Sequence, residues 1–402
     1  MYIQYNWNKF RAIKYKHNNI VGINSIHRQR GTVIIFVTLL LTIIFSFTAL
    51  AIDVGYLFVV RNELQNAADS AALAGANYLY GDLYKTSSVS CAQSNVTFPN
   101  WSCAESNTTA AIQLNKATNT TLTNGQVNYG YWNITGNPTG LQSTSIIPGI
   151  DNLPTVKVTI SKSNGQNGGG IATFFAGIMG INTLDASATA VAVVASPGYT
   201  KDLFPVAITQ CMYDKYWDST TSPNGPKIDP ITGHFYEIKI GAANQSGLCQ
   251  GGQWTSFDLD TQNVPKIRDL IDYSTGAQQS SNPVILGMGD NTWIQSGVQA
   301  SIYDKISDCM AATVNSCEYV VIPVVCFNSP TCDRLDTHAQ TPITAFACIR
   351  LLEVNKTGSD KYVKAEMTMP SDSNCKISGG GIGPNYGVYM PPKLVNYSGN
   401  TY

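Results

Sequence analysis

The feature that most constrains this chain is an uncharged, strongly apolar run near its N-terminus. Residues 31–52 are 22 consecutive residues without a charged side chain. As a helix rising about 1.5 Å per residue, this run is long enough to cross the roughly 30 Å hydrocarbon core of a bilayer. Its polar side chains are Thr and Ser, whose hydroxyls can bond back to the helix backbone. The sequence therefore predicts a transmembrane helix over 31–52.

The charges on the two sides of this run predict its orientation. Residues 1–30 contain no acidic residue and six basic ones: Lys9, Arg11, Lys14, Lys16, Arg28 and Arg30. Since the whole chain carries −1, the remainder carries −7. Basic residues are enriched on the cytoplasmic side of membrane spans. We therefore expect a basic cytoplasmic tail over 1–30 and an extracytoplasmic location for everything after Asp53.

Two other interpretations of the apolar run are weaker. A cleaved signal peptide has an apolar region of roughly 7–15 residues, shorter than this one, and usually a shorter basic leader. The chain after Asp53 also continues as a helical pattern without an obvious break. A buried helix of a soluble core is disfavoured by the length of the run and by the basic cluster before it. An uncleaved anchor is the favoured interpretation.

Beyond Asp53 the pattern changes to that of an amphipathic helix. No proline interrupts residues 31–80, so a single helix of roughly 70 Å is predicted, with 53–80 as a helical stalk outside the membrane. Small residues allow close approach of two helices, because large side chains hold the backbones apart. Whether this surface packs on a partner or on the chain's own domain stays open. The small residues are Ala67, Ala68, Ala71, Ala72, Ala74, Gly75 and Ala76.

A family resemblance rests on this region. The motif consists of Gly31 at the start of the apolar run, then Asp53-Val54-Gly55, Leu64-Gln65-Asn66-Ala67-Ala68-Asp69 and Ala71-Ala72-Leu73-Ala74-Gly75-Ala76. It resembles the N-terminal region of the TadE/TadG-like proteins of bacterial Flp (tight adherence) pilus systems. Weaker likenesses at 125–132, 156–160 and 174–191 extend the resemblance over about residues 30–200.

The resemblance implies a membrane-anchored accessory component of pilus assembly or adhesion that acts by protein–protein interaction. It implies a bacterial inner-membrane location, with the N-terminus cytoplasmic and the C-terminal domain periplasmic. The partners would be the membrane and other pilus-assembly or envelope proteins, with homo- or hetero-oligomers through the stalk helix. The fifth residue after Gly31 is Phe36 and not the Glu of a prepilin-peptidase site, so the uncleaved, TadG-like branch fits better. The expected interaction residues are Asp53, Gly55, Leu64, Asn66, Ala68, Asp69, Ala71 and Gly75.

The part after the stalk is predicted to be α+β with antiparallel sheet, because its strand patterns do not alternate regularly with helices. Residues 86–150 are rich in Thr, Asn and Ser and indicate loops with short strands. Ser196-Pro197-Gly198 suggests a boundary between a first β-rich unit, 81–197, and a Cys-rich α+β unit, 198–402. Strands are expected at 126–133, 154–161, 184–195, 203–209, 234–241, 318–327, 342–354 and 361–369, and helices at 171–179, 261–272 and 298–311.

All ten cysteines follow the apolar run, which predicts disulfides in an oxidising compartment. The pairs closest in sequence are the easiest to close: Cys91–Cys103, Cys309–Cys317 and Cys326–Cys332. These leave Cys211–Cys249 and Cys348–Cys375, so this pairing is one hypothesis among many connectivities. A zinc site is disfavoured because the sequence has no Cys-x-x-Cys.

No catalytic motif, cofactor or metal site is predicted, and no basic patch outside the tail indicates nucleic-acid binding. His234 and Glu237 would face opposite sides of a strand of period two and so make a poor catalytic pair. The alternatives to an assembly protein are a membrane-tethered extracytoplasmic enzyme and a carbohydrate- or surface-binding adhesin. Converging carboxylates or histidines in a cleft would favour the enzyme, and an exposed row of aromatic residues would favour the adhesin.

Overall fold

A computed structural model gives the fold of the chain. It describes residues 32–80, 99–218, 225–241, 249, 251–257, 264–279, 284–295, 300–328, 330–335, 339–369, 374–375, 377–384 and 386–395. By compactness the chain divides into two units, residues 1–52 and residues 53–402.

Helix α1 (Thr32–Ala76) is a single element of 45 residues, as the uninterrupted pattern predicts. Its side chains up to Ile52 are almost all exposed, although most of them are large and apolar. The hydroxyls of Thr42, Ser46 and Thr48 donate to the backbone carbonyls four residues earlier, at 2.7, 2.8 and 2.9 Å. Among the described residues it is the one helix long and apolar enough to span a membrane.

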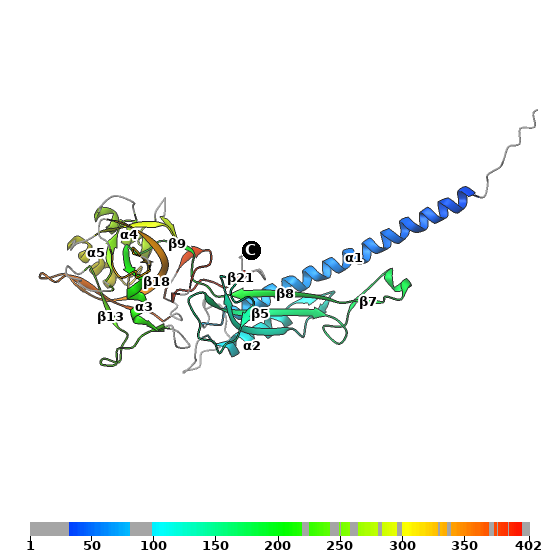
Figure 1. Ribbon diagram of the computed structural model, residues 1–402, viewed down its shortest axis with the longest axis horizontal. Helices are drawn as coiled ribbons and strands as arrows, with labels where there is room; N and C mark the ends of the chain where they lie inside the picture. Colours follow the sequence, from blue (N-terminus) through cyan, green and yellow to red (C-terminus); the bar gives the residue numbers. More distant parts are fainter. Residues whose placement is uncertain are drawn as a thin grey trace, which may run out of the picture. The chain divides into compact units, whose positions relative to one another are not determined.

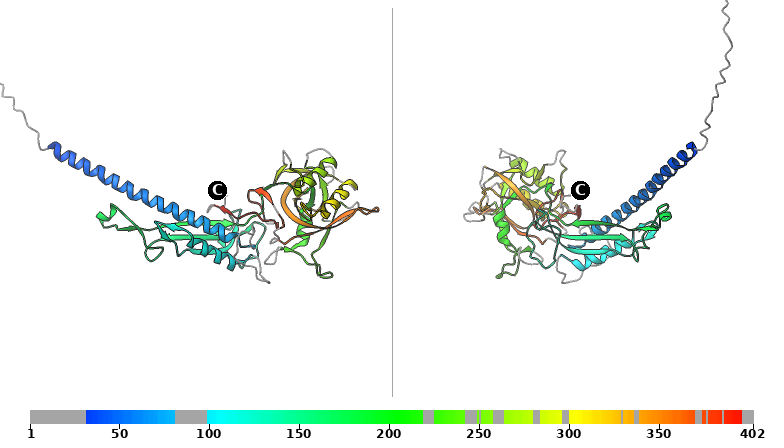
Figure 2. Two further views of the ribbon diagram at one scale, coloured as in Figure 1. Left: turned by 180° about the vertical axis from the view of Figure 1, so that it is seen from behind. Right: turned by 45° about the vertical axis from the view of Figure 1, so that its right-hand side comes forward.

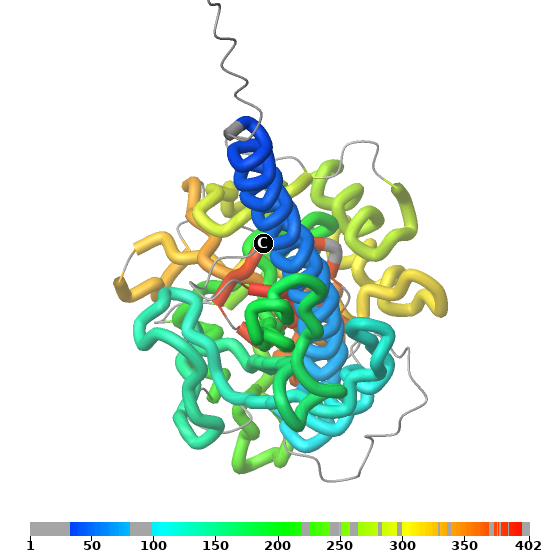
Figure 3. Tube along the Cα trace, turned by 90° about the vertical axis from the view of Figure 1, so that its right-hand side faces the viewer, coloured from blue at the N-terminus to red at the C-terminus, as the bar shows by residue number. Residues whose placement is uncertain are grey.

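From Asp53 onward α1 is instead an amphipathic helix packed on the chain's own sheet (Figures 1 and 3). The sheet has five antiparallel strands in the order β21-β8-β5-β3-β4. Small side chains predominate on the buried side of the helix, which lets the backbones approach closely. The α1 residues of this hydrophobic core are Val60, Leu64, Ala67, Ala68, Ala71, Ala72 and Ala76, and they share it with Val156, Val158, Ile160 and Ala190 of the sheet.

The five strands come from distant parts of the chain. They are β3 (Gln126–Asn133), β4 (Leu141–Gln142), β5 (Asn152–Lys162), β8 (Ala186–Val193) and β21 (Lys393–Val395). The pairing of β21 with β8, Leu394 opposite Ala192, brings the C-terminal segment back to the first sheet. The chain order alone does not predict this addition.

Helix α2 (Trp101–Gln113) corrects the expectation of loops and short strands in this region. Its Ser, Thr and Asn side chains disfavour helices in general, because they offer the backbone alternative hydrogen bonds. Here Asn100 caps the N-terminus by accepting from the Cys103 N–H at 3.1 Å. The Thr108 hydroxyl donates to the Ala104 carbonyl at 2.7 Å, so a polar residue is satisfied within the helix itself. Its small side chains then allow α2 to lie directly on α1.

The second sheet has seven strands in the order β13-β19-β18-β16-β14-β10-β17. Since β17 also pairs with β18, five of them close into a ring (Figure 2). Apart from the parallel β10–β17 pair, its strand pairs are antiparallel. The strands are β10 (Val206–Thr209), β13 (Glu237–Ile240), β14 (Gln253–Thr255), β16 (Asn291–Gln295), β17 (Tyr319–Val325), β18 (Gln340–Asn355) and β19 (Tyr362–Met367).

Strands β10 and β17 are buried on both faces and carry nearly continuous apolar runs, whereas β13 at the edge alternates exposed and buried residues. Val206 and Ile208 face one core, and Ala207 between them faces another. Helices α3 (Gln210–Tyr216), α4 (Val264–Thr275) and α5 (Ala300–Ala311) contribute to the first of these cores.

The smaller pairings join β9 (Tyr199–Lys201) to β15 (Ile285–Gly287) and β20 (Ser378–Gly380), β1 (Lys116–Ala117) to β2 (Thr120–Thr121), and β11 (Trp217–Asp218) to β12 (Gly225–Pro226).

The predicted α+β class is confirmed, and each predicted strand overlaps an observed one. The predicted helices 261–272 and 298–311 correspond to α4 and α5 within a few residues.

The prediction of a helix at 171–179 is wrong. Residues 171–172 form β6 (Ile171–Ala172), which pairs with β7 (Thr183–Leu184), and only the 3₁₀ helix η1 (Ala176–Met179) lies between them. Glycines near both ends of this segment, and a turn at Gly180, prevent a longer helix.

Four of the five predicted disulfides are present: Cys211–Cys249, Cys309–Cys317, Cys326–Cys332 and Cys348–Cys375. In the fifth predicted pair, Cys103 is disulfide-bonded, whereas Cys91 lies outside the described residues.

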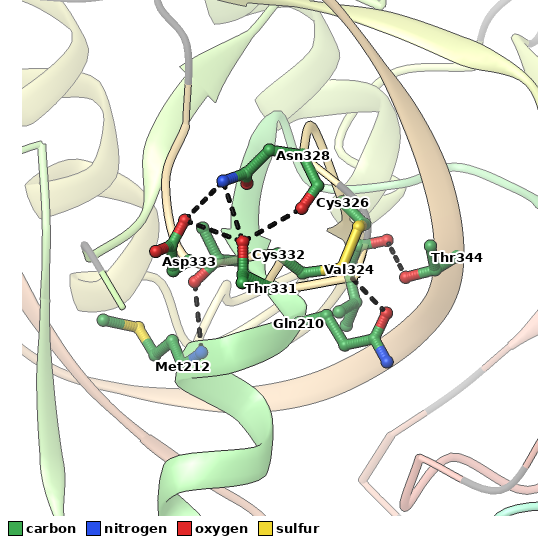
Figure 4. The surroundings of a disulfide bond; sticks show 10 residues. Gln210, Met212, Val324, Cys326, Asn328, Thr331, Cys332, Asp333 and Thr344 are labelled. Atoms are coloured by element: carbon green, nitrogen blue, oxygen red, sulfur yellow. Dashed lines mark hydrogen bonds between the residues drawn. A yellow bond between two sulfur atoms is a disulfide. The ribbon is translucent and has the colours of Figure 1, made fainter. Parts of the chain in front are cut away.

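Two of the disulfides meet at the ends of β10 and β17, and Figure 4 shows the surroundings of Cys326–Cys332. The Cys332 carbonyl accepts from the Cys211 N–H at 3.2 Å. Asn328, inside the loop that the bridge closes, donates to the carboxylate of Asp333, the residue just after that loop, at 2.6 Å. This bond and further hydrogen bonds lower the pKa of Asp333, and they outweigh burial, which acts to raise it. The cysteines therefore tie irregular segments to the strands of the ring.

The two glycines of α1 after Asp53 give a matched test of the helix packing. A Cβ at Gly75 would collide with the Thr108 hydroxyl and lie 3.0 Å from the Ala104 carbonyl oxygen, whereas a Cβ at Gly55 meets nothing within 4 Å. We expect Gly75→Ala to lower the free energy of unfolding by about 1–3 kcal/mol through overpacking. Gly55→Ala should raise it by about 0.5–1 kcal/mol, because alanine is the better helix former. Thermal unfolding of the full chain in detergent, followed by near-ultraviolet circular dichroism, measures both.

Adding Thr108→Ala to Gly75→Ala removes the hydroxyl that causes the collision and should restore part of the lost stability. Equal effects of the two glycine substitutions would contradict the packing of α1 on α2.

Candidate functional site: the Asp53 end of helix α1

Asp53 is the first residue after the apolar run, and its side chain is 5% exposed. One carboxylate oxygen accepts from the Phe174 N–H at 2.7 Å. The other accepts from the N–H groups of Phe175 at 3.1 Å and Ala176 at 2.7 Å. An acidic residue that sequence spacing places at a membrane boundary is therefore an internal hydrogen-bond acceptor.

These three N–H groups lie at the start of η1, where backbone donors lack partners within the helix. The carboxylate of Asp53 serves as their acceptor from a different element. The turn is closed at its other end by the Ile181 N–H, which donates to the Ala176 carbonyl at 3.1 Å. Gly180 takes a left-handed conformation, with φ 87°, that a residue with a Cβ rarely adopts. The segment between β6 and β7 is thus an ordered loop fixed to α1.

The hydrogen bonds also set the charge state of Asp53. Burial of the carboxyl acts to raise its pKa, but the bonds from Ala176, Phe174 and Phe175 outweigh this effect, and the pKa lies below its ordinary value. At neutral pH Asp53 is therefore an anion, which is the form that accepts all three N–H groups. An aromatic contact adds to the attachment, since the rings of Tyr56 and Phe174 meet edge to face at 5.4 Å between centroids.

Apart from Asp53, the predicted interaction residues fall into two groups in the structure. Leu64, Ala68, Ala71 and Gly75 are buried against the chain's own sheet and α2. For these four residues the structure favours packing on the chain's own domain, the second of the two alternatives left open by the sequence. The close approach of α2 explains why position 75 is a glycine.

The other group lies outside that core. Gly55 and Asn66 are exposed. Asp69 is half-buried and accepts from the Gln65 side chain at 2.8 Å. The exposed side of the helix also carries three residues that the motif did not single out. We call Gly55, Val59, Asn62, Asn66 and Ser70 the exposed stripe of α1, because their spacings of four and three place them along one face.

Two places among the described residues bear on the enzyme alternative, a cavity and the His234–Glu237 segment. A polar cavity of about 770 Å³ is lined by Asp202, Tyr273, Glu318 and neighbouring residues. Glu318 is bound to Arg350 at 2.8 Å, and Asp202 lies 3.9 Å from Lys201. His234 is exposed in the loop before β13, while Glu237 pairs with Lys364 at 3.3 Å. No group of metal-binding side chains occurs in the described part of the chain.

An exposed aromatic row of the kind expected for glycan binding is likewise not seen on the described strands. The aromatic residues of β3 contact the chain itself. Trp101 of α2 stacks on Tyr129 at 5.7 Å between ring centroids and meets Tyr131 edge to face at 5.5 Å. These rings join α2 to the sheet.

Comparison with known protein families gives two matches. Residues 31–77 match the Tad family of TadE/G-like Flp pilus-assembly proteins. Residues 74–192 match the Tad_C family of Tad-like Flp pilus-assembly proteins. No curated protein and no solved structure matches the chain significantly. The two matched regions cover α1, α2 and four of the five strands packed on them, so the resemblance seen in the sequence is confirmed over 31–192.

Replacing the Asp53 carboxylate should release the loop that it holds. We expect Asp53→Ala to increase chymotrypsin cleavage after Phe174 and Phe175 at neutral pH, because the backbone there loses its acceptor. Asp53→Asn should have a smaller effect of the same sign, since the amide oxygen is a weaker acceptor. Asp69→Asn, on the same helix, is the control and should leave the cleavage rate unchanged. Equal cleavage of the parent chain and Asp53→Ala would contradict the attachment.

The lowered pKa also predicts a pH dependence with a definite sign. The unfolded carboxyl titrates near 3.8, and the folded one titrates below that value. The stabilisation of the loop by Asp53 is therefore complete above the ordinary pKa and lost as the pH falls through the folded pKa. Hydrogen exchange of the 174–176 amides, corrected for intrinsic rates, should show this loss in the parent and not in Asp53→Asn. Loss of protection above pH 3.8 would contradict it.

Proposed function

We propose that this chain, whose residues 31–192 match two families of Flp pilus-assembly proteins, is a membrane-anchored component that acts by protein–protein interaction. Two observations together support the proposal: the family match, and the difference in burial between the two halves of α1. Its first half is apolar and exposed, and its second half is packed on a domain. We propose a structural role and no catalysis.

The exposed apolar half supports an anchor. Large apolar side chains that remain in water are unfavourable, and a span of this length matches the thickness of a bilayer. The six basic residues before it support a cytoplasmic N-terminus and an extracytoplasmic location of residues 53–402. In a bacterium with an inner membrane, that location is the periplasm. The disulfides of residues 211–375 fit this oxidising side.

Within residues 53–402 we propose a functional division near residue 197. The first part, 53–197, contains the family-matched helices and four strands of the first sheet. The second, 198–402, contains the ring of strands and four disulfides and lies beyond the matched region. The shared pilus-assembly role is thus assigned to the first part.

The exposed stripe of α1 is our proposed contact surface for partners. It has no charged side chain, and it follows directly on the anchor, so another membrane-anchored helix could pack along it. The partner is either a second copy of this chain or another pilus-assembly or envelope protein. Ala68, Ala71 and Gly75 are not part of this surface. Their packing fixes α1 on the domain, so that the exposed stripe faces outward.

A photo-crosslinking amino acid at Asn66 tests the contact surface in cells that contain the pilus system. We expect a crosslinked product of higher mass from Asn66, because this side chain is exposed on the stripe. Ala110, exposed on the far side of α2, is the matched control and should give little product. Crosslinking equal at the two positions, or none from Asn66, would contradict the proposed surface.

A further inference from the structure

The loop between β6 and β7, residues 173–182, exposes an unusual number of large apolar side chains. Phe174 is 64%, Ile178 86%, Met179 84% and Ile181 49% exposed. No charged residue occurs between Lys162 and Asp185, so the loop carries no charge that would favour water over an apolar environment. We call residues 173–182 the apolar loop. Clustered apolar side chains on an ordered surface indicate an interaction site more strongly than scattered ones do.

The apolar loop is ordered by its own hydrogen bonds. The Thr173 N–H donates to the Asn182 carbonyl at 3.1 Å, which continues the β6–β7 pairing to the base of the loop. The Asp53 carboxylate fixes the first turn, and the Gly180 N–H closes the second by donating to the carbonyls of Ala176 and Gly177. The apolar side chains are therefore held outward by a built structure.

The apolar loop lies next to the C-terminal end of the apolar run. Asp53, which holds the loop, is the first residue after the apolar run, and the loop lies beside α1 there (Figures 1 and 2). Two further exposed apolar residues of α1, which do not belong to the exposed stripe, follow Asp53: Val54 and Phe58. At about 1.5 Å per residue, Phe58 lies roughly 9 Å along the helix from Ile52. The headgroup region on each side of a bilayer is about 5–8 Å thick, so these residues lie at or just beyond it.

We propose that the apolar loop inserts into the extracytoplasmic headgroup region of the bilayer and makes a second membrane contact beside the anchor. The occupant of this surface is lipid. Amphipathic elements bind membrane interfaces by burying apolar side chains just below the headgroups. The proposal rests on the membrane anchoring in the proposed function. With two contacts, anchor and loop, the membrane fixes the orientation of residues 53–197 as well as their location.

Continuity with the anchor favours lipid over a second copy of the chain. The Asp53 hydrogen bonds hold the loop at the end of the apolar run, where a bilayer that contains the anchor must also meet it. A protein partner seated on the apolar loop would have to displace lipid from it.

Tryptophan substitutions in the full chain, reconstituted in phospholipid vesicles, test the proposal. Ile178→Trp places the reporter at the tip of the apolar loop. Ile231→Trp is the matched control, because Ile231 is 92% exposed in the loop that precedes β13. Phe45→Trp, within the apolar run, reports on the anchor itself. The emission added by each substitution, above that of the six native tryptophans, is measured with lipids brominated near the headgroup and with lipids brominated deep in the chains.

We expect Ile178→Trp to lose most of its added emission with the shallow bromines, Phe45→Trp with the deep bromines, and Ile231→Trp with neither. If Ile178→Trp behaves like Ile231→Trp while Phe45→Trp is quenched, the loop does not enter the bilayer and the anchor stands. If Phe45→Trp is not quenched either, the anchoring itself is wrong. A blue-shifted Ile178→Trp emission that bromolipids do not quench would assign the loop to a protein partner and overturn the proposal.

Discussion

The close packing of the second half of α1 on α2 and the five-stranded sheet is the interaction on which the rest of the structure depends. It requires small residues on both helices, because Gly75 lies against Thr108 and Ala104 with no room for a Cβ. The same helix continues without a break into the apolar run. One continuous element therefore contains both the apolar run and the half of the helix that packs on the sheet.

Asp53 is the position at which these two roles of α1 meet. Up to Ile52 the helix presents apolar side chains on all sides, and from Asp53 onward it has a buried side and an exposed side. The carboxylate connects this transition to the loop that carries Phe174 and Ile178 by hydrogen bonds to the backbone. A single side chain thus links the start of the packed half of α1 to a loop with large, exposed apolar side chains.

Much of this architecture could be predicted from the sequence, because the relevant signals are local. An uncharged run predicts a helix that can span a membrane, alternation predicts strands such as β3 and β5, and short separations favoured pairs such as Cys326–Cys332. The features that were missed depend on contacts between distant segments. Helix α2 has a composition typical of loops and is stabilised by its Asn100 cap and by α1. The sequence could not say which face of α1 is buried, that Asp53 binds residues 174–176, or that β21 returns to the first sheet.

The central claim is that residues 32–52 remain in the membrane as an uncleaved anchor, with residues 53–402 on the extracytoplasmic side. Its most direct test is a fusion of alkaline phosphatase, which is active only outside the cytoplasm, to the C-terminus of the full chain. The quantity to measure is the share of enzyme activity that stays with the membranes after an alkaline carbonate wash. We expect an active enzyme that is almost entirely retained in the washed membranes. An inactive fusion would reverse the orientation, and activity released into the soluble fraction would show that the apolar run is not an anchor.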